Sequence, residues 1–290
     1  MTDRSLTMTD RSVMLGRMPM LETSTGPVHY DERGAGAAVV LLPSGAHDHH
    51  DYDELRALLP PERFRTIALD WPAHGASPPG EGSASVTRFA DVAEELVAAL
   101  APEGAVVVGN SIGGFSAARL AIRRPELVRG LVLIDSGGFA GRPPHVRIFC
   151  ALMARPAFLR RIYPTFSARY MRARTDADRR ARDTGVATTR ADPGLRAVAQ
   201  LWGSFASPAH DLRADAHRIT ASTLVIWGRR DPVIAVKLGR RIATLISGAR
   251  LVVLDTGHVP QTTDPEAVAR ELVPFAAAAF AEQREAVATT

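Results

Sequence analysis

Residues 105–118 read AVVVGNSIGGFSAA, an apolar β-branched run followed by a glycine-rich turn and an alanine-rich segment. This pattern predicts a buried strand that turns sharply into a helix, with Ser111 on the turn in a strained conformation. Gly109 and Gly113 are expected where a side chain would collide with the neighbouring strand or helix. Such a turn lifts a serine hydroxyl above the edge of the sheet, so Ser111 is the candidate nucleophile.

The same turn predicts part of a site for a developing negative charge. The amide of Ile112 lies at the start of the predicted helix 112–123, where unpaired N–H groups favour an anion. A G-x-S-x-G sequence also arises by chance as an ordinary glycine-rich turn. Here a predicted strand precedes it and a predicted helix follows it, which favours the functional interpretation.

The composition limits the classes of protein to which the chain can belong. Its 290 residues are 46% hydrophobic, which excludes a disordered chain and allows one large α/β domain or two small ones. Arginines are concentrated over residues 147–182, but no base-stacking aromatics are interleaved with them and no nucleic-acid-binding motif is present. Solvated helix faces are the simpler interpretation, so we expect no nucleic-acid partner.

Cysteine usage and hydropathy indicate a compartment. Cys150 is the only cysteine, so it cannot form an internal disulfide, and a reducing cytoplasm fits. No long window is apolar and uncharged, and the first twelve residues, MTDRSLTMTDRS, lack the hydrophobic core of a signal peptide. We expect a cytoplasmic monomer or homodimer with no membrane partner and a disordered tail over residues 1–13.

Strand and helix patterns alternate on both sides of the serine turn. Apolar runs predict strands at 18–22, 26–31, 37–42, 65–69, 130–134, 222–227 and 249–254. Helical patterns occur at 51–59, 86–100, 235–246 and from 264 to about 280. The alternation predicts an α/β fold whose core is formed by residues 14–136 and 221–283, followed by a tail over residues 284–290.

Between residues 137 and 220 the alternation stops. This stretch has no convincing strand and contains helical patterns at 145–154, 156–163 and 195–205, so we expect a helical cap that excludes water and lines a substrate cavity. Most of its large apolar side chains are expected to pack the cap against itself. Those that could face the cavity are Phe149, Met153, Phe158, Tyr163, Phe166, Tyr170, Trp202 and Phe205. Of these, we expect Phe149, Met153, Tyr170 and Trp202 to contact the substrate.

Two further residues complete the predicted catalytic set. Asp231 and His258 each follow a predicted strand, as Ser111 does. A serine hydroxyl needs a base to remove its proton, and a carboxylate to orient that base and stabilise its charged form. Asp231 could instead cap the next turn, with Asp135 as the substitute acid, and His258 could be a buried structural histidine. Their positions favour Ser111, Asp231 and His258 as nucleophile, acid and base.

The loop after the predicted strand 37–42 is expected to contribute to the same site, because loops at the carboxyl ends of parallel strands build such sites. The amide of Ala46 is the expected second donor to an oxyanion, with Gly45 next, and an ordinary connecting turn is the alternative. Candidate substrate contacts near the catalytic residues are Ser44, His47, Asn110 and Val259.

The other histidines are given structural roles. His74 precedes the serine and lies in a Pro- and Gly-containing turn, so it is not the expected base. His47, His49 and His50 resemble metal ligands, but no second cluster with suitable spacing completes a site. We therefore expect neither a metal nor another cofactor.

The motifs DWPAHGAS, GNSIGG, WGRRDP and TGHVPQ, with their spacing, resemble those of capped α/β-hydrolases over residues 18–280. The resemblance implies a mostly parallel, eight-stranded sheet flanked by helices with a helical cap. The Gly109-Asn110-Ser111 turn is similar to that of meta-cleavage-product hydrolases, which cut carbon–carbon bonds in vinylogous 1,5-diketones. Two positions depart from the family pattern, because residues 43–45 are Pro-Ser-Gly where many relatives have His-Gly, and Val259 stands where those hydrolases often have tryptophan.

These observations predict a cofactor-free serine hydrolase that forms an acyl-enzyme on Ser111. Its substrate would be a small or medium apolar ester, lactone or diketone-like compound. The same fold also hosts lyases, acyltransferases and cyclases, as well as receptors that bind a ligand without converting it. From the residues, these alternatives stay open.

Overall fold

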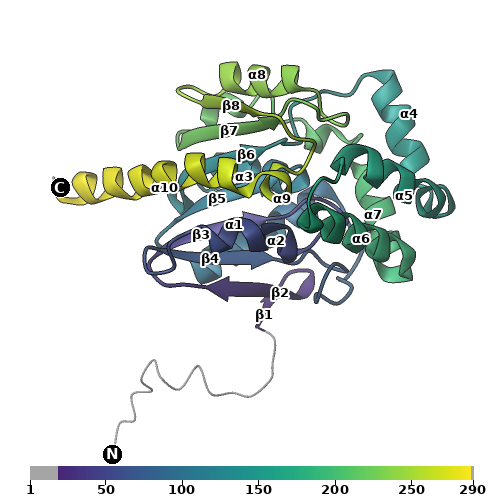
Figure 1. The fold of residues 1–290 in the computed structure, drawn as a ribbon, viewed down its shortest axis with the longest axis horizontal. Helices are drawn as coiled ribbons and strands as arrows, with labels where there is room; N and C mark the ends of the chain where they lie inside the picture. Colours follow the sequence, from purple (N-terminus) through teal and green to yellow (C-terminus); the bar gives the residue numbers. More distant parts are fainter. Residues whose placement is uncertain (1–18, 289–290) are drawn as a thin grey trace, which may run out of the picture.

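The computed structural model describes residues 19–288, and within them eight strands form one sheet in the order β1-β2-β4-β3-β5-β6-β7-β8 (Figure 1). β1 and β2 are antiparallel to their neighbours, and the remaining pairs are parallel. The strands are β1 (Met20–Thr23), β2 (Gly26–Arg33), β3 (Ala37–Leu42), β4 (Phe64–Leu69), β5 (Ala105–Asn110), β6 (Val128–Ile134), β7 (Ser222–Gly228) and β8 (Arg250–Leu254). The mostly parallel eight-stranded sheet is confirmed.

Helices cover both faces of the sheet, because strand side chains alternate between two apolar layers. Val107 of β5 packs in the layer that holds α2 (Val86–Leu100), α3 (Ile112–Arg123) and α8 (Val236–Leu245). Its neighbours Val106 and Val108 pack in the opposite layer, with α1 (Asp53–Ala57) and α10 (Pro265–Ala288). Burial on both faces explains why the parallel strands are continuous apolar runs in the sequence.

The cap consists of four helices between β6 and β7, namely α4 (Pro144–Met153), α5 (Pro156–Met171), α6 (Asp176–Arg190) and α7 (Asp192–Ser204). Figure 1 shows them grouped at one end of the sheet, opposite the end toward which α10 extends. They share an apolar cluster that Val259 joins from the core. The short helices are η2 (His49–Tyr52), η3 (Pro125–Leu127), η4 (Pro208–His210), η5 (Ala216–Arg218) and α9 (Pro260–Thr263).

Two helices of the cap differ from their predictions. α5 continues past Pro164 to Met171, although proline removes one backbone hydrogen bond from a helix interior. α6 was not predicted, because its sequence is strongly polar. A capping box starts it, in which the Thr175 hydroxyl accepts from the amide of Asp178 while the Asp178 carboxylate accepts from that of Thr175.

The predicted ends of the chain and one core helix also need correction. The predicted helix 51–59 is divided into η2 and the short α1. α10 continues to Ala288, so the predicted helix end near residue 280 is wrong, and the predicted tail 284–290 is helical as far as residue 288. The predicted tail 1–13 lies outside the described residues. In the described part of the chain, every helix is too short or too polar to cross a lipid bilayer.

Candidate active site

Ser111 lies on the turn between β5 and α3, with backbone angles φ 57° and ψ −112°. A positive φ is costly for a residue that carries a side chain, so the surroundings must hold this conformation. The Ser111 amide donates to the carbonyl of Ile134 at 3.0 Å, and its own carbonyl accepts from the amide of Gly137 at 2.9 Å. The end of β6 thus fixes the strained turn predicted for the candidate nucleophile.

Two glycines make this turn sterically possible. A Cβ atom on Gly109 would lie 2.2 Å from the carbonyl oxygen of Gly113. A Cβ atom on Gly113 would lie 2.1 Å from the carbonyl oxygen of Leu42, at the end of β3. Both distances are far below van der Waals contact, so the first turn of α3 approaches the sheet only because side chains are absent there.

His258 and Asp231 form a buried pair. Nδ1 of His258 lies 2.6 Å from Oδ2 of Asp231, whose other oxygen accepts from the amides of Val233 and Ile234 at 2.7 and 3.1 Å. An ionised carboxylate can only accept, so Nδ1 carries the proton and Nε2 keeps its lone pair. This is the tautomer that a general base requires.

The backbone of His258 is fixed from two sides. Its carbonyl accepts from the side-chain amide of Asn110 at 2.9 Å, and its amide donates to the carbonyl of Tyr170 at 3.3 Å. Asn110 is completely buried and also donates to the carbonyl of Ile134 at 3.1 Å. The residue before Ser111 therefore connects the serine turn to the histidine loop and does not reach the cavity.

Asp135, the alternative acid, contacts Asp231. Its carboxyl accepts from the amide of Gly228 at 3.0 Å, and it shares a hydrogen bond with the carboxyl of Asp231. Burial of Asp135 and the negative charge of Asp231 raise the pKa of Asp135 well above its ordinary value. The raised pKa favours the protonated form of Asp135, which can donate to Asp231, and Asp231 is the carboxylate that lies against the imidazole of His258.

A cavity of about 610 Å³ lies between the core and the cap and is lined by both Ser111 and His258. This volume is in the range that encloses small organic ligands. Lys237 and Arg241 of α8 supply positive charge to the lining. The aromatic side chains that the cap contributes to the wall are Phe149, Tyr163, Phe166, Tyr170 and Trp202, with Phe205 directly after α7.

Cys150 also lines this cavity and is a possible competitor as nucleophile. Its burial raises the pKa of the thiol to about 11. The thiolate is the reactive form of cysteine, so Cys150 is a neutral apolar part of the wall near neutral pH.

The predicted substrate contacts fall into two groups. Ser44, Phe149, Tyr170 and Trp202 line the cavity. Met153 and Val259 are completely buried in the apolar cluster of the cap, and His47 and Asn110 are buried behind the wall. The structure therefore places these four predicted contacts outside the cavity wall.

The amide of Ala46, the expected second oxyanion donor, already has a partner in the structure. It donates to Nε2 of His74 at 3.1 Å, and Nδ1 of His74 lies 2.9 Å from the carbonyl of Pro72. Burial lowers the pKa of His74 to about 4, so the neutral ring donates from Nδ1 and accepts at Nε2. The amide of Ala46 is thus occupied, while Gly45, the second choice, lines the cavity with Ile112.

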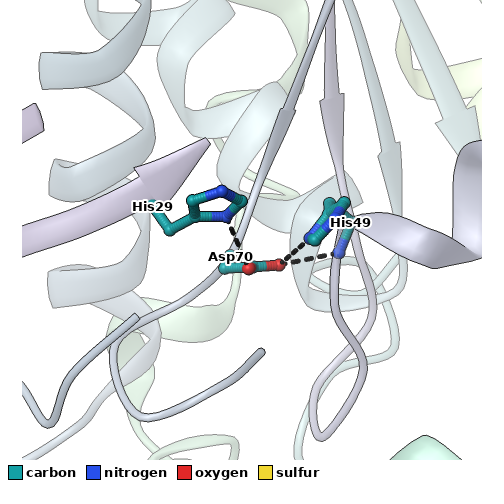
Figure 2. A group of neighbouring side chains, drawn as sticks. All are labelled: His29, His49 and Asp70. Atoms are coloured by element: carbon teal, nitrogen blue, oxygen red, sulfur yellow. Dashed lines mark hydrogen bonds and ion pairs between the residues drawn. The ribbon is translucent and has the colours of Figure 1, made fainter. Parts of the chain in front are cut away.

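His29 of β2 and His49 of η2 share a partner, Asp70, that their spacing in the sequence did not reveal. Asp70 gathers His29 and His49, whose Nδ1 atoms each lie 2.8 Å from one of its oxygens (Figure 2). The two oxygens also accept from the amides of His49 and Ala76, at 2.8 and 2.9 Å. Spacing in the sequence did not reveal that His29 and Asp70 lie beside His49. The ligand-type atoms are hydrogen-bonded to one another, which favours a structural role that joins β2 to the turn after β4.

The sequence interpretation missed His210 of η4, which lines the cavity behind Ser111. Its Nδ1 lies 3.2 Å from the carbonyl of Phe205, and burial lowers the pKa of the ring to about 4, so the imidazole is neutral. A single histidine outside any strand-end motif gave no signal for this position.

Comparisons with known proteins agree with this geometry. Residues 39–271 match the model of the alpha/beta hydrolase family. The 2-hydroxymuconate semialdehyde hydrolase of Pseudomonas putida is 32% identical over 230 residues, which cover 75% of this chain and 78% of that protein. A 2-hydroxy-6-oxononadienedioate/2-hydroxy-6-oxononatrienedioate hydrolase of Cupriavidus pinatubonensis is 26% identical over 269 residues, covering 86% of this chain and 90% of that protein.

The fold also matches solved structures. The crystal structure of the enol-lactonase from Burkholderia xenovorans LB400 aligns with a TM-score of 0.77 at 25% identity, covering 89% of this chain and 99% of that one. The resemblance to meta-cleavage-product hydrolases that the motifs indicated is therefore confirmed by overall similarity.

Proposed function

Because this chain belongs to the alpha/beta hydrolase family, we propose that it is a serine hydrolase that forms an acyl-enzyme on Ser111. The observation that carries the proposal is the 2.6 Å contact between His258 and Asp231 at a cavity that Ser111 also lines. In this reaction Nε2 of His258 takes the proton of the Ser111 hydroxyl as its oxygen attacks a carbonyl carbon. Asp231 stabilises the imidazolium that forms.

The negative charge that develops on the carbonyl oxygen is proposed to be held by two amides. The amide of Ile112 lies at the N-terminus of α3, where the helix dipole favours an anion. Gly45 is its neighbour, since a Cβ atom on Gly45 would lie 3.8 Å from the Ile112 side chain. The imidazolium of His258 then protonates the leaving group, and an activated water releases the acyl group from Ser111.

The cavity favours a substrate with an apolar body and a carbonyl at one end. Its aromatic wall fits an apolar chain or ring, and Lys237 and Arg241 would favour a negatively charged group on the substrate. The similar proteins are named as hydrolases of an oxo diacid and of a semialdehyde and as an enol-lactonase, and each of these substrates contains a carbonyl group. The proposed substrates are therefore esters, lactones and vinylogous diketones of small or medium size.

The proposal is tested by rapid mixing with p-nitrophenyl butanoate. We expect a burst of p-nitrophenol equal to the amount of enzyme, followed by slower turnover, because acylation precedes deacylation. Ser111→Ala should abolish both phases, and the proposal fails if this variant keeps full turnover. Heavy-oxygen water should label the released acid, whereas a lyase, an acyltransferase or a cyclase would form its product without solvent oxygen.

A further inference from the structure

We propose that Asp51, His47, Tyr170 and Tyr163 form a hydrogen-bond relay that donates to a second oxygen of the substrate, close to the carbonyl that Ser111 attacks. The inference rests on the proposed hydrolase function and narrows its substrate class. The acyl group would carry an oxo or hydroxyl oxygen within a few atoms of the scissile carbonyl.

The relay is continuous from the core to the cap. Nδ1 of His47 lies 3.0 Å from each carboxylate oxygen of Asp51, and Nε2 lies 2.6 Å from the hydroxyl of Tyr170. The hydroxyls of Tyr170 and Tyr163 are 2.9 Å apart. Each of the four residues is at most 4% exposed, and both tyrosines line the catalytic cavity. The buried carboxylate of Asp51 and the imidazole of His47 are thus linked by hydrogen bonds to two tyrosines that line the cavity.

Joining the cap to the core does not require this arrangement. Burying a charged or strongly polar pair costs desolvation free energy, and apolar side chains of similar volume would join the same surfaces at lower cost. The cap already has such a contact, because Val259 of the core packs into its apolar cluster. The polar chain therefore indicates a task beyond attachment, at the cavity end where the phenols lie.

The direction of donation depends on the charge of His47, whose Nδ1 lies 3.0 Å from both oxygens of the buried carboxylate of Asp51. Burial lowers the pKa of His47, but the charge and hydrogen bond of Asp51 and the charge of Asp48 outweigh burial, so the pKa is raised. With the imidazolium, three hydrogens are available for the two contacts that join His47 to Tyr170 and Tyr170 to Tyr163. One phenol O–H is then left over, and the cavity is where it can find an acceptor. With a neutral ring, two hydrogens would serve two contacts and none would remain.

The position of Tyr170 places the acceptor near the reacting carbonyl. Its ring packs edge-on against the ring of His258, with centroids 5.7 Å apart, and its backbone carbonyl accepts from the amide of His258 at 3.3 Å. At the other end, His47 follows Gly45 by two residues, on the loop that we propose holds the oxyanion.

The test compares two esters of equal chain length, p-nitrophenyl 4-oxopentanoate and p-nitrophenyl pentanoate. In the wild type, kcat/KM should favour the oxo ester. Tyr170→Phe should lower the ratio of kcat/KM for the oxo ester to that for the plain ester about tenfold, because one hydrogen bond in a water-excluded site is lost. Tyr163→Phe should shift the ratio in the same direction.

Tyr52→Phe is the matched control, because it removes a buried phenol hydroxyl that donates to the carbonyl of Leu42 at 2.9 Å, outside the relay. It should leave the ratio unchanged. The ratio does not depend on the fraction of active enzyme, so partial unfolding of a variant does not imitate the effect. If Tyr170→Phe does not fold, Tyr163→Phe decides the result.

The relay proposal is contradicted if the tyrosine variants that fold keep the wild-type ratio of kcat/KM. It is also contradicted if the wild type does not favour the oxo ester. A loss of equal size on both esters also overturns it, since that result indicates attachment of the cap alone. These outcomes are separate from failure of the hydrolase proposal, which Ser111→Ala tests on the plain ester that makes no use of the relay.

Discussion

The core and the cap bring polar side chains to the same cavity by different physical routes. In the core, Ser111, Asp231 and His258 follow the ends of β5, β7 and β8, and parallel strands deliver their carboxyl ends to one edge of the sheet. In the cap, Tyr163 and Tyr170 lie on one helix, and they reach the cavity only because α5 packs over that edge. Sheet topology therefore determines where the core residues lie, and helix packing determines where the two tyrosines of the cap lie.

The largest effect is expected from the two carboxyls of the core. Asp231→Asn should lower kcat about 10³–10⁴-fold, because the amide cannot hold His258 in the required tautomer or stabilise its charge. Asp135→Asn is the matched control, since its amide can still donate to Asp231 and accept from Gly228. The kcat of the Asp135→Asn variant should fall by less than about tenfold. Equal losses in the two variants, measured by steady-state ester hydrolysis, would show that catalysis depends on Asp135 as much as on Asp231 and would break the comparison.

The next effect concerns how the cap is attached. Oδ1 of the buried Asp178 accepts from the hydroxyls of Thr262 and Thr263, both at 2.8 Å, and so joins α6 to α9. Asp178→Ala should lower the free energy of unfolding by about 2–3 kcal/mol, because buried donors lose their acceptor. Arg180→Gln removes only the exposed pair with Glu54 and should cost about 0–1 kcal/mol. Urea unfolding measures both variants, and similar values would show that the buried carboxylate is not the stronger link.

A smaller effect is expected in the apolar wall of the cap. Trp202 lines the cavity and packs edge-on against Phe149, with ring centroids 5.4 Å apart. Trp202→Ala should shift the ratio of kcat/KM for p-nitrophenyl octanoate over butanoate about tenfold toward the longer ester, because the pocket gains volume. Phe158→Ala truncates a cap residue that is 37% exposed and outside the cavity wall, and should leave the ratio unchanged. If the ratio of kcat/KM shifted only in the Phe158→Ala variant, the cap would line the cavity with side chains other than Trp202.

The smallest effect is a pH dependence of stability. The pKa of Asp135 is raised in the folded chain by burial and by the charge of Asp231, so the folded state holds a proton that the unfolded state has released above about pH 4. This contribution to stability is full below the unfolded pKa and is lost as pH rises through the folded pKa. The asparagine of Asp135→Asn has no proton to release. The free energy of unfolding of this variant should therefore rise relative to that of the wild type as the pH increases from 4 to 7. Urea titrations at several pH values check this, and a constant difference would contradict it.

Sequence patterns predicted most of the core, because strand length, apolar continuity and glycine placement are local properties. The turn at Ser111 needs glycine at residues 109 and 113, where a Cβ atom would overlap the backbone. The same reasoning did not reveal the partner of the Ala46 amide. That amide donates to His74, a residue of a different loop, and no local pattern reveals such a long-range bond.

The cap could be predicted as helical, but not in its packing. α6 lacked a continuous apolar face, and α5 continues through Pro164, a residue type that usually ends or kinks a helix. His47 looked like a substrate contact because it follows the loop after β3. Its place behind the cavity wall depends on Tyr170, which lies 123 positions further along the chain. Helix orientation of this kind depends on contacts that periodicity does not contain.

Labelling with a fluorophosphonate, followed by peptide mass spectrometry of the folded protein, tests the central claim most directly. A serine becomes reactive toward this reagent only where a base and an oxyanion site activate it. We predict one adduct, on Ser111, that is absent from Ser111→Ala and formed far more slowly by Asp231→Asn. A folded wild type that carries no adduct, or carries it on another residue, would contradict the account.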